Sequence, residues 1–331
     1  MGTKYQKALY RGYTSSAFTN RTTEPSWQGI NGPTLRAEVG DMIQILFCNA
    51  LTSNYASMHS MGLSYSKEYE GSLYPNTTTG ATTVAAPGDS VSPGDCVVYK
   101  WLINNGSAPP EGQESLMWSY HSFVNMAVDL NTGLCGPTIV YQPGGMNKTM
   151  ASNREFVLLY EVFDESNSFL ASTNAEMYNT SSNASAIAKP ATLETSYTGN
   201  SSFWQPQLVN MPTVSLSSTQ APSFYTLNGY VLANSPSFES CTDDAAIWYV
   251  YSFGGASHVF HMHGNGFTYR GLNMASKSLN DGNMMTLQAT MYATGIWQVI
   301  CHVSNHLSDG MQGLYQVYPK ASCPLDKLAS K

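Results

Sequence analysis

The seven histidines of this 331-residue chain all lie in four short segments, and this confinement constrains the fold more than any other feature of the sequence. The segments span 58–62, 120–123, 258–264 and 300–306, and the last continues to Met311. Histidines that served solubility or filled a core would be scattered along the chain. Because imidazole is a common metal ligand, the pattern predicts a fold that gathers distant segments around metal.

The composition favours a β-rich protein with a proper core. Charged residues make up 11% of the chain, against roughly 25% in ordinary soluble domains. Apolar residues make up 42%, and the length favours two domains of roughly 150 residues each. The net charge of −7 disfavours nucleic acid as a partner, and no run of ~18 apolar residues predicts a membrane span.

Strand signals dominate, and helical periodicity is scarce. Apolar strands are predicted at 36–47, 96–103 and 156–163, and the strand pattern resumes from Phe224 to Tyr318. The polar stretch 146–154 predicts a boundary between a first domain over 1–148 and a second over 149–331. Residues 164–222 are rich in Ser, Thr and Asn and are predicted to form an extended, partly ordered loop.

The two halves of the chain echo each other weakly. Each half runs a strand into a histidine-bearing segment. Each also places a tryptophan shortly before a late histidine, Trp118 before His121 and Trp297 before His302. We therefore expect an all-β protein made of two tandem Greek-key β-sandwich domains of common origin.

The last histidine segment has the spacing of a blue copper site. Cys301, His306 and Met311 supply a thiolate, an imidazole and a thioether from one strand and the loop that follows it. His258, one strand and loop away in the same half, is the natural second imidazole. Two histidines, one cysteine and a weak axial methionine are the ligands of electron-transfer copper.

The remaining histidines of the second half predict a second metal site. His261 and His263 are two residues apart, so on a strand their side chains share a face. His302 follows Cys301 directly and would therefore point away from the blue site. The His302 side chain would point into the second site, while its backbone is bonded directly to that of the copper ligand Cys301.

The chain resembles the ceruloplasmin and hephaestin family of multicopper oxidases over nearly its whole length. The resemblance rests on Leu9-Tyr10-Arg11-Gly12-Tyr13-Thr14, Gly32-Pro33, Glu38-Val39-Gly40-Asp41, Lys67 to Pro75, Gly133 to Pro137, Arg154 to Leu159, Leu227 to Tyr230 and Gly295 to Met311. It implies two cupredoxin-like domains, with type 1 copper in the second and none in the first. Ceruloplasmin has six such domains.

The resemblance also implies a trinuclear copper cluster, which that family holds with eight histidines in four His-x-His pairs. Five of the eight are present here, and Met61, Phe123 and Ile300 replace the other three. By the family pattern, type 2 copper would use His59 and His261. One type 3 copper would use His121 and His302 with Met61 as a soft third ligand, and the other would keep only His263. A full trinuclear centre is therefore not expected.

The other five cysteines allow at most two disulfides within the chain once Cys301 is set aside as a ligand. We pair Cys48 with Cys96, since both lie on predicted strands of the first half. We pair Cys241 with Cys323, near the two ends of the second half. Cys135 is then free or bonded to another chain.

Seven Asn-x-Ser/Thr sequons favour a secreted, extracellular glycoprotein. They begin at Asn20, Asn76, Asn105, Asn147, Asn179, Asn183 and Asn200. The first residues, Met1-Gly2-Thr3-Lys4, contain no apolar signal core, so we expect that a signal was removed or replaced.

Three functions remain open at this stage. The first is copper binding and one-electron transfer by an intact blue site beside a degenerate oxygen site.

The second is an active oxidase acting on Fe(II), Cu(I) or a phenolic donor. Two-domain relatives would complete its cluster between subunits of a homotrimer. Asn305 stands where the family often has an acidic residue, with Asp309 nearby, so the resemblance supports an iron site only weakly. The third is a structural extracellular glycoprotein that binds copper for stability.

Overall fold

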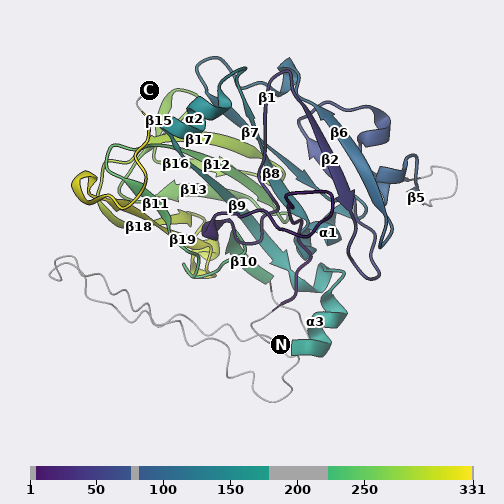
Figure 1. The fold of residues 1–331 in the computed structure, drawn as a ribbon. Helices are drawn as coiled ribbons and strands as arrows, with labels where there is room; N and C mark the ends of the chain where they lie inside the picture. The colour runs from purple at the N-terminus through teal and green to yellow at the C-terminus, as the bar shows by residue number, and fades with distance from the viewer. Residues whose placement is uncertain (1–4, 76–81, 179–222, 330–331) are drawn as a thin grey trace.

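Two β-sandwich units lie side by side in the computed structural model, which describes residues 5–75, 82–178 and 223–329 (Figure 1). The first unit contains strands β1 (Leu35–Glu38), β2 (Met42–Cys48), β3 (His59–Met61), β4 (Tyr74–Pro75), β5 (Thr82–Thr83), β6 (Cys96–Leu102), β7 (Ser115–His121) and β8 (Cys135–Tyr141). Its main sheet has the order β1-β8-β7-β3, and β2 pairs with β6 in a second sheet. A core that includes Tyr99, Trp101 and Tyr120 fills the space between them.

The second unit is built from two larger sheets. Its strands are β9 (Arg154–Asp164), β10 (Ser223–Leu227), β11 (Phe238–Cys241), β12 (Ala245–Phe253), β13 (His258–Met262), β14 (Phe267–Tyr269), β15 (Leu272–Met274), β16 (Ser276–Leu279), β17 (Met284–Thr290), β18 (Gly295–Cys301) and β19 (Gln312–Tyr318). One sheet has the order β10-β9-β12-β17-β14-β15, and the other has the order β11-β19-β18-β13-β16. Their inner faces share an apolar core centred on Trp248 and Phe260.

The two units repeat one another in topology, which confirms the weak echo in the sequence. In each unit a parallel pair, β1 with β8 or β11 with β19, is extended by antiparallel strands that carry the histidine motifs. The glycine after each histidine strand has a positive φ and packs on a tryptophan. A Cβ on Gly62 would meet Trp118 at 2.0 Å, and one on Gly264 would meet Trp297 at 2.6 Å. Only glycine fits either position.

The interface between the units is apolar with a polar rim. The faces of β7 and β8 pack against β9 and β12 through residues that include Ile139, Leu159 and Ile247. The Met117 amide donates to Thr286 Oγ1 across the interface at 3.0 Å. The two sandwiches therefore share a continuous buried surface.

Helices are few and short. They are α1 (Met126–Thr132), α2 (Met146–Ser152), α3 (Ala171–Tyr178) and α4 (Ser304–Ser308), with 3-10 turns at Ser26–Gln28, Lys67–Tyr69, Pro87–Asp89, Asn105–Ser107, Glu165–Asn167 and Lys320–Ser322. Helix α2 occupies the polar stretch where the domain boundary is predicted. No described helix is both long and apolar enough to cross a membrane.

Helix α3 lies within residues 164–222, where an extended and only partly ordered loop is predicted, so part of this segment is helical. Its sequence is only weakly amphipathic, so tertiary contacts must fix it. The Gln6 amide donates to Asn174 Oδ1 at 2.7 Å, and Asn174 Nδ2 donates back to the Gln6 carbonyl at 3.2 Å. The rest of the predicted loop, 179–222, lies outside the described residues.

Both expected disulfides are present. Cys48 and Cys96 face each other across β2 and β6, and Cys241 is joined to Cys323. Cys135 is free and fully buried. Asn20, Asn105 and Asn147 are exposed, as glycosylation would require, whereas Asn76, Asn179, Asn183 and Asn200 lie outside the described residues.

Candidate metal centre

Three of the predicted blue-site residues meet at one point in the second unit. Cys301 Sγ lies 3.7 Å from His258 Nδ1 and 3.5 Å from His306 Nδ1, and the two Nδ1 atoms are 3.2 Å apart. Within the described part of the chain, this is the one group of three or more His, Cys, Asp or Glu side chains whose donor atoms gather closely enough for a metal ion.

Two neighbouring strands and a short helix position these donors. His258 begins β13, Cys301 ends β18, and His306 lies in α4 directly beyond. The pairing of Phe260 with Cys301 fixes the register between the strands, and the Val259 amide lies 3.5 Å from Cys301 Sγ. The thiol is therefore held by backbone geometry on a rigid sheet.

The fourth predicted ligand, Met311, lies against the same site. The Met311 carbonyl accepts from the Cys301 amide at 3.0 Å, and the Met311 amide donates to the His306 carbonyl at 2.9 Å. Its side chain is fully buried in the core that also contains Cys301. The backbone thus ties the methionine to both the thiol and the imidazole.

Burial keeps the site's imidazoles neutral and ready to bind metal. Burial, together with the neighbouring charge of His306, lowers the pKa of His258 to about 4. Burial also lowers the pKa of His306 and, without metal, raises the pKa of the Cys301 thiol. A bound cation reverses the preference of the thiol, because metal ligation deprotonates cysteine.

Two tyrosines complete the surroundings of the blue site, and the sequence analysis missed both. The ring of Tyr160 on β9 lies 5.5 Å from that of His258, and its hydroxyl donates to the Ile300 carbonyl at 2.8 Å. The ring of Tyr225 on β10 lies 4.8 Å from that of His306. No local motif marks these tyrosines, because the packing of one sheet of the sandwich on the other brings them to the ligands.

The first unit brings together His59 and His121. They face each other across β3 and β7, and their ring centroids are 5.5 Å apart. His59 Nδ1 donates to the Glu70 carbonyl and His121 Nδ1 to the Ser122 carbonyl, each at 2.8 Å. These bonds place the proton on Nδ1 and leave each Nε2 lone pair available, which is the usual arrangement around metal-binding histidines.

The second unit brings together His261, His263 and His302. The ring of His261 lies 5.1 Å from that of His263 and 5.2 Å from that of His302. His261 Nδ1 donates to the Ala275 carbonyl at 2.7 Å. His302 is exposed while Cys301 is buried, as expected for neighbouring residues on opposite faces.

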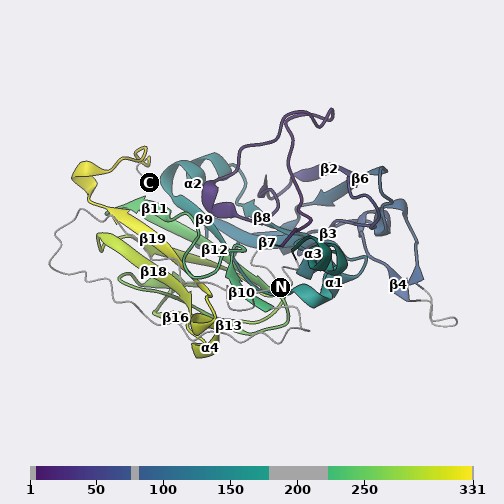
Figure 2. The same cartoon turned by 90° about the horizontal axis from the view of Figure 1, so that it is seen from below.

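The chain does not bring these two groups of histidines together. Figure 2 places β3 among the strands of the first unit and β13, β18 and α4 in the other half of the molecule. Among the described residues, no ring contact joins His59 or His121 to His261, His263 or His302.

The three substituting residues take different positions. The ring of Phe123 lies 5.0 Å from that of His59 and 5.5 Å from that of His121. Ile300 is buried on β18, where an aliphatic side chain offers no ligand atom. Met61 lies beside His59 on β3, and its sulfur accepts a hydrogen bond from Ser119 Oγ at 3.5 Å.

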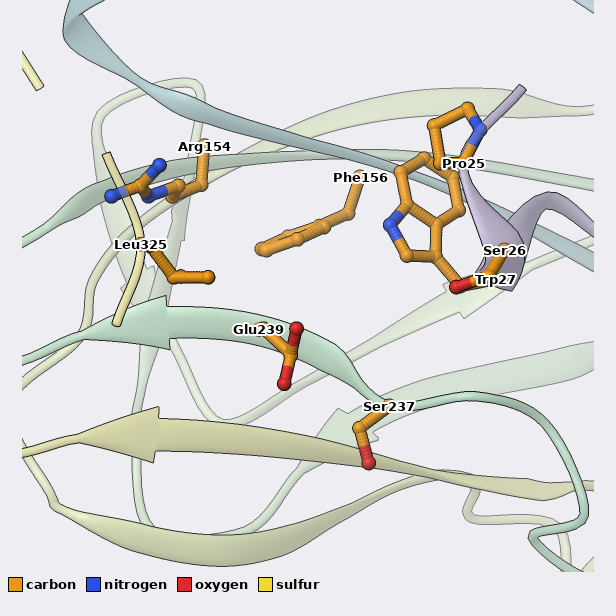
Figure 3. A pocket seen from close by; sticks show the side chains of 8 residues that line it. All are labelled: Pro25, Ser26, Trp27, Arg154, Phe156, Ser237, Glu239 and Leu325. Atoms are coloured by element: carbon orange, nitrogen blue, oxygen red, sulfur yellow. The ribbon is translucent and has the colours of Figure 1, made fainter. Parts of the chain in front are cut away.

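A surface pocket of about 280 Å³ lies between the segment Pro25 to Trp27 and the second unit, apart from all these residues. In Figure 3 the ring of Phe156 lies between the side chains of Arg154 and Trp27, with Glu239 below it. Arg154 is engaged by Asp244 at 2.8 Å. None of the predicted ligands lines this pocket, so we assign it no part in metal binding.

Comparison with solved structures identifies the fold. The chain superposes on a copper nitrite reductase from Nitrosomonas europaea with a TM-score of 0.56 and 12% identity, covering 94% of this chain and 92% of that one. The multicopper oxidase mgLAC gives a TM-score of 0.57 at 13% identity, covering 89% and 78%. The all-β fold of two tandem cupredoxin-like domains is confirmed. With the His-Cys-His donor set, it defines a cupredoxin-type copper protein.

Sequence comparison places the chain within that class. No protein-family model matches it. Hephaestin of Homo sapiens is 31% identical over 343 residues, which cover 100% of this chain and 27% of hephaestin. Ceruloplasmin of Mus musculus is 30% identical over 322 residues, which cover 96% and 27%. The chain belongs to the ceruloplasmin/hephaestin-like family of multicopper oxidases, and it spans about a quarter of the length of these relatives. Copper is its cofactor, and the His258, Cys301 and His306 group is its type 1-like site.

Proposed function

We propose that this protein is a secreted copper protein that transfers single electrons through its type 1 site, and that its second copper site is altered from the family pattern. The convergence of Cys301, His258 and His306 carries the proposal. Copper held there supplies a one-electron couple. The strands hold the three donors in place and exclude water, which keeps the reorganisation cost of electron transfer low.

The route of electrons into the site is set by burial. Cys301 and His258 are at most 1% exposed, whereas His306 is 7% exposed. The imidazole of His306 is therefore the ligand nearest to solvent, and the ring of Tyr225 lies over it. An electron donor would approach this edge. On the other side, the covalent link from Cys301 to His302 leads toward His261.

The altered second site supports a homotrimer. One group of histidines lies in the first domain and the other in the second, and each group alone is an incomplete ligand set for the trinuclear cluster of the family. A head-to-tail contact would place His59 and His121 of one copy beside the second-domain histidines of the next. Heterologous contacts of this kind generate a closed ring, such as a trimer, when the rotation between neighbouring copies closes.

Secretion is supported by the two disulfides and by the exposed glycosylation sequons. Two disulfides persist readily only in oxidising compartments. The three described sequon asparagines are exposed and accessible to glycosylation. We therefore place the protein outside the cell as a glycoprotein.

The decisive experiment is to replace Cys301 by Ser and record the visible spectrum of the copper-loaded protein. The blue absorption should vanish and the protein should lose about one copper per chain, because the colour arises from the copper–thiolate bond. Cys135→Ser is the matched control, since Cys135 is equally buried but lies on β8 of the first domain, away from His258 and His306. Unchanged colour in Cys301→Ser would refute the proposal.

A working oxidase is the second candidate, and the gathering of His261, His263 and His302 favours it. Asn305 and Asp309 are exposed beside His306, where a donor such as Fe(II) would approach. Oxygen uptake that follows added Fe(II) and is lost in His261→Ala would support this function. Absence of uptake with Fe(II), Cu(I) and phenolic donors would exclude it.

A further inference from the structure

We propose that His59, His121 and Met61 form a copper(I) site that is complete within a single copy of the chain. This inference rests on the altered second site of the proposed function and names its metal form and ligands, and it places that site within one copy in place of a site shared between copies. It is independent of the blue site, which lies in the other domain.

The strand register places the three side chains on one face. His59 and Met61 are two residues apart on β3, so both point to the same side of the sheet. His121 and Ser119 are opposite them on β7. The hydrogen bond from Ser119 Oγ to the Met61 sulfur shows that the thioether lies over this face. Neighbours along a strand on one face are roughly 7 Å apart, within reach of a long methionine side chain.

Both imidazoles are already oriented for metal. Each Nδ1 is committed to a backbone carbonyl, of Glu70 for His59 and of Ser122 for His121. The free nitrogen in each ring is therefore Nε2. His121 is only 2% exposed, so its ring cannot turn freely toward water. A prearranged pair of this kind lowers the cost of binding.

The absence of hard ligands selects the metal form. Among the described residues, no third His, Cys, Asp or Glu gathers with this pair, because the one such group is the blue site. Zinc and Cu(II) would lack the four or more ligands that they prefer. A thioether is a soft ligand, and soft ligands favour Cu(I). Two imidazoles and one thioether therefore match Cu(I) and its low coordination number.

The surrounding side chains reinforce this choice. Phe123 contacts both imidazole rings, Phe253 of the second domain lies 5.4 Å from His121, and Tyr65 lies 6.0 Å from His59. These aromatic side chains carry no charge, which disfavours the doubly charged ion relative to the singly charged one. Phe123 stands where the family has a histidine. This position therefore offers no ligand atom and instead presents an uncharged aromatic ring, which suits Cu(I).

The test is an anaerobic Cu(I) titration, against a chromogenic chelator, of full-length protein that carries Cys301→Ser, His258→Ala and His306→Ala. Cys301→Ser alone would leave two imidazoles and the Met311 thioether at the blue site, so the thiol and both imidazoles are removed to take that site out of the count. We expect one tightly bound Cu(I) per chain, with X-ray absorption showing two nitrogen neighbours and one sulfur neighbour. Met61→Leu should weaken binding about tenfold and remove the sulfur signal, and His121→Ala should abolish binding.

Met58→Leu is the matched control. Met58 lies just before the same strand but is buried in the core of the first domain, so its loss should leave Cu(I) affinity unchanged. Circular dichroism verifies that each variant is folded. If Met61→Leu binds as tightly as Met58→Leu, or if sulfur is absent from the parent spectrum, the ligand assignment is wrong.

Dilution separates this site from one shared between copies. An affinity that persists at protein concentrations where the chain is monomeric supports a complete site in one copy. An affinity lost on dilution overturns the proposal and points to a shared cluster. The blue absorption of the protein that retains Cys301 reports on the proposed electron-transfer function separately.

Discussion

At the scale of single residues, burial decides which protonation state each histidine holds. His258 and His121 belong to different domains, yet burial lowers the pKa of each to about 4. Both are therefore neutral at physiological pH and need no deprotonation before they bind metal. The ordinary pKa of histidine is near 6.5, so folding keeps protons off these rings.

These two pKa shifts predict that the copper-free protein loses stability in mild acid. Below pH 6.5 the unfolded chain binds protons that the folded chain does not bind until about pH 4. Falling pH across this window therefore favours unfolding, by roughly 2–3 kcal/mol for each histidine. Urea unfolding of the copper-free protein at pH 7 and pH 4.5 measures the loss.

His121→Gln isolates one contribution to this pH dependence. The variant should lose less stability than the parent between the two pH values, because it cannot take up that proton when unfolded. Identical pH dependence in the two proteins would show that His121 does not titrate as its burial requires.

At the scale of elements, the connection from α4 to β19 links two ligands through a glycine. Gly310 has φ +108, and a Cβ there would lie 3.1 Å from Leu232 Cγ. Its amide donates to the Leu307 carbonyl, and its carbonyl accepts from the Leu232 amide at 2.7 Å. The turn therefore holds His306 and Met311 at a fixed separation.

Gly310→Ala should strain this turn by about 1–2 kcal/mol and weaken copper binding about tenfold. The strain acts on the segment that carries His306 and Met311, so the blue absorption should also shift. Gly144→Ala is the control, because Gly144 also has a positive φ but faces open space. Chelator competition measures the affinities, and equal affinities in the two variants would contradict the prediction.

At the scale of the whole molecule, a polar cluster ties the two domains together beside their apolar interface. Glu155 of the second domain accepts from Arg36 of the first at 2.6 Å and from Tyr141 at 2.9 Å. Tyr249 donates to the same carboxylate at 2.5 Å. The Glu155 side chain is 7% exposed, so its charge depends on these partners.

Arg36→Met should destabilise the docked pair of domains by about 2 kcal/mol, because it leaves a buried carboxylate without its cation. The hydroxyls of Tyr141 and Tyr249 still donate to the Glu155 carboxylate. The loss of stability should therefore be smaller than for a buried carboxylate with no partner. Urea unfolding measures the effect. Arg36→Met with Glu155→Gln should recover part of the stability, and a double variant no more stable than the single one would show that the Glu155 charge is not the cause.

The sequence by itself determined the blue-site ligands, the strand-rich fold, the domain repeat and both disulfides. The ligands Cys301, His306 and Met311 are recorded locally, because their spacing survives in any strand-and-loop arrangement. Strand alternation likewise places His261 and His263 on one face without knowledge of the partner strands. Short-range geometry is the physical reason in both cases. The disulfides join cysteines that are 48 and 82 residues apart, and their pairing followed from the predicted strands and domain ends on which the cysteines lie.

Only the tertiary structure decided which residues from distant segments meet. It separated the first-domain histidines from those of the second domain, and it placed Tyr160 and Tyr225 against the blue-site ligands. It also folded α3 within a predicted loop through contacts with Gln6. Such outcomes depend on the sum of many weak contacts between sheets, and no single stretch of sequence contains that sum.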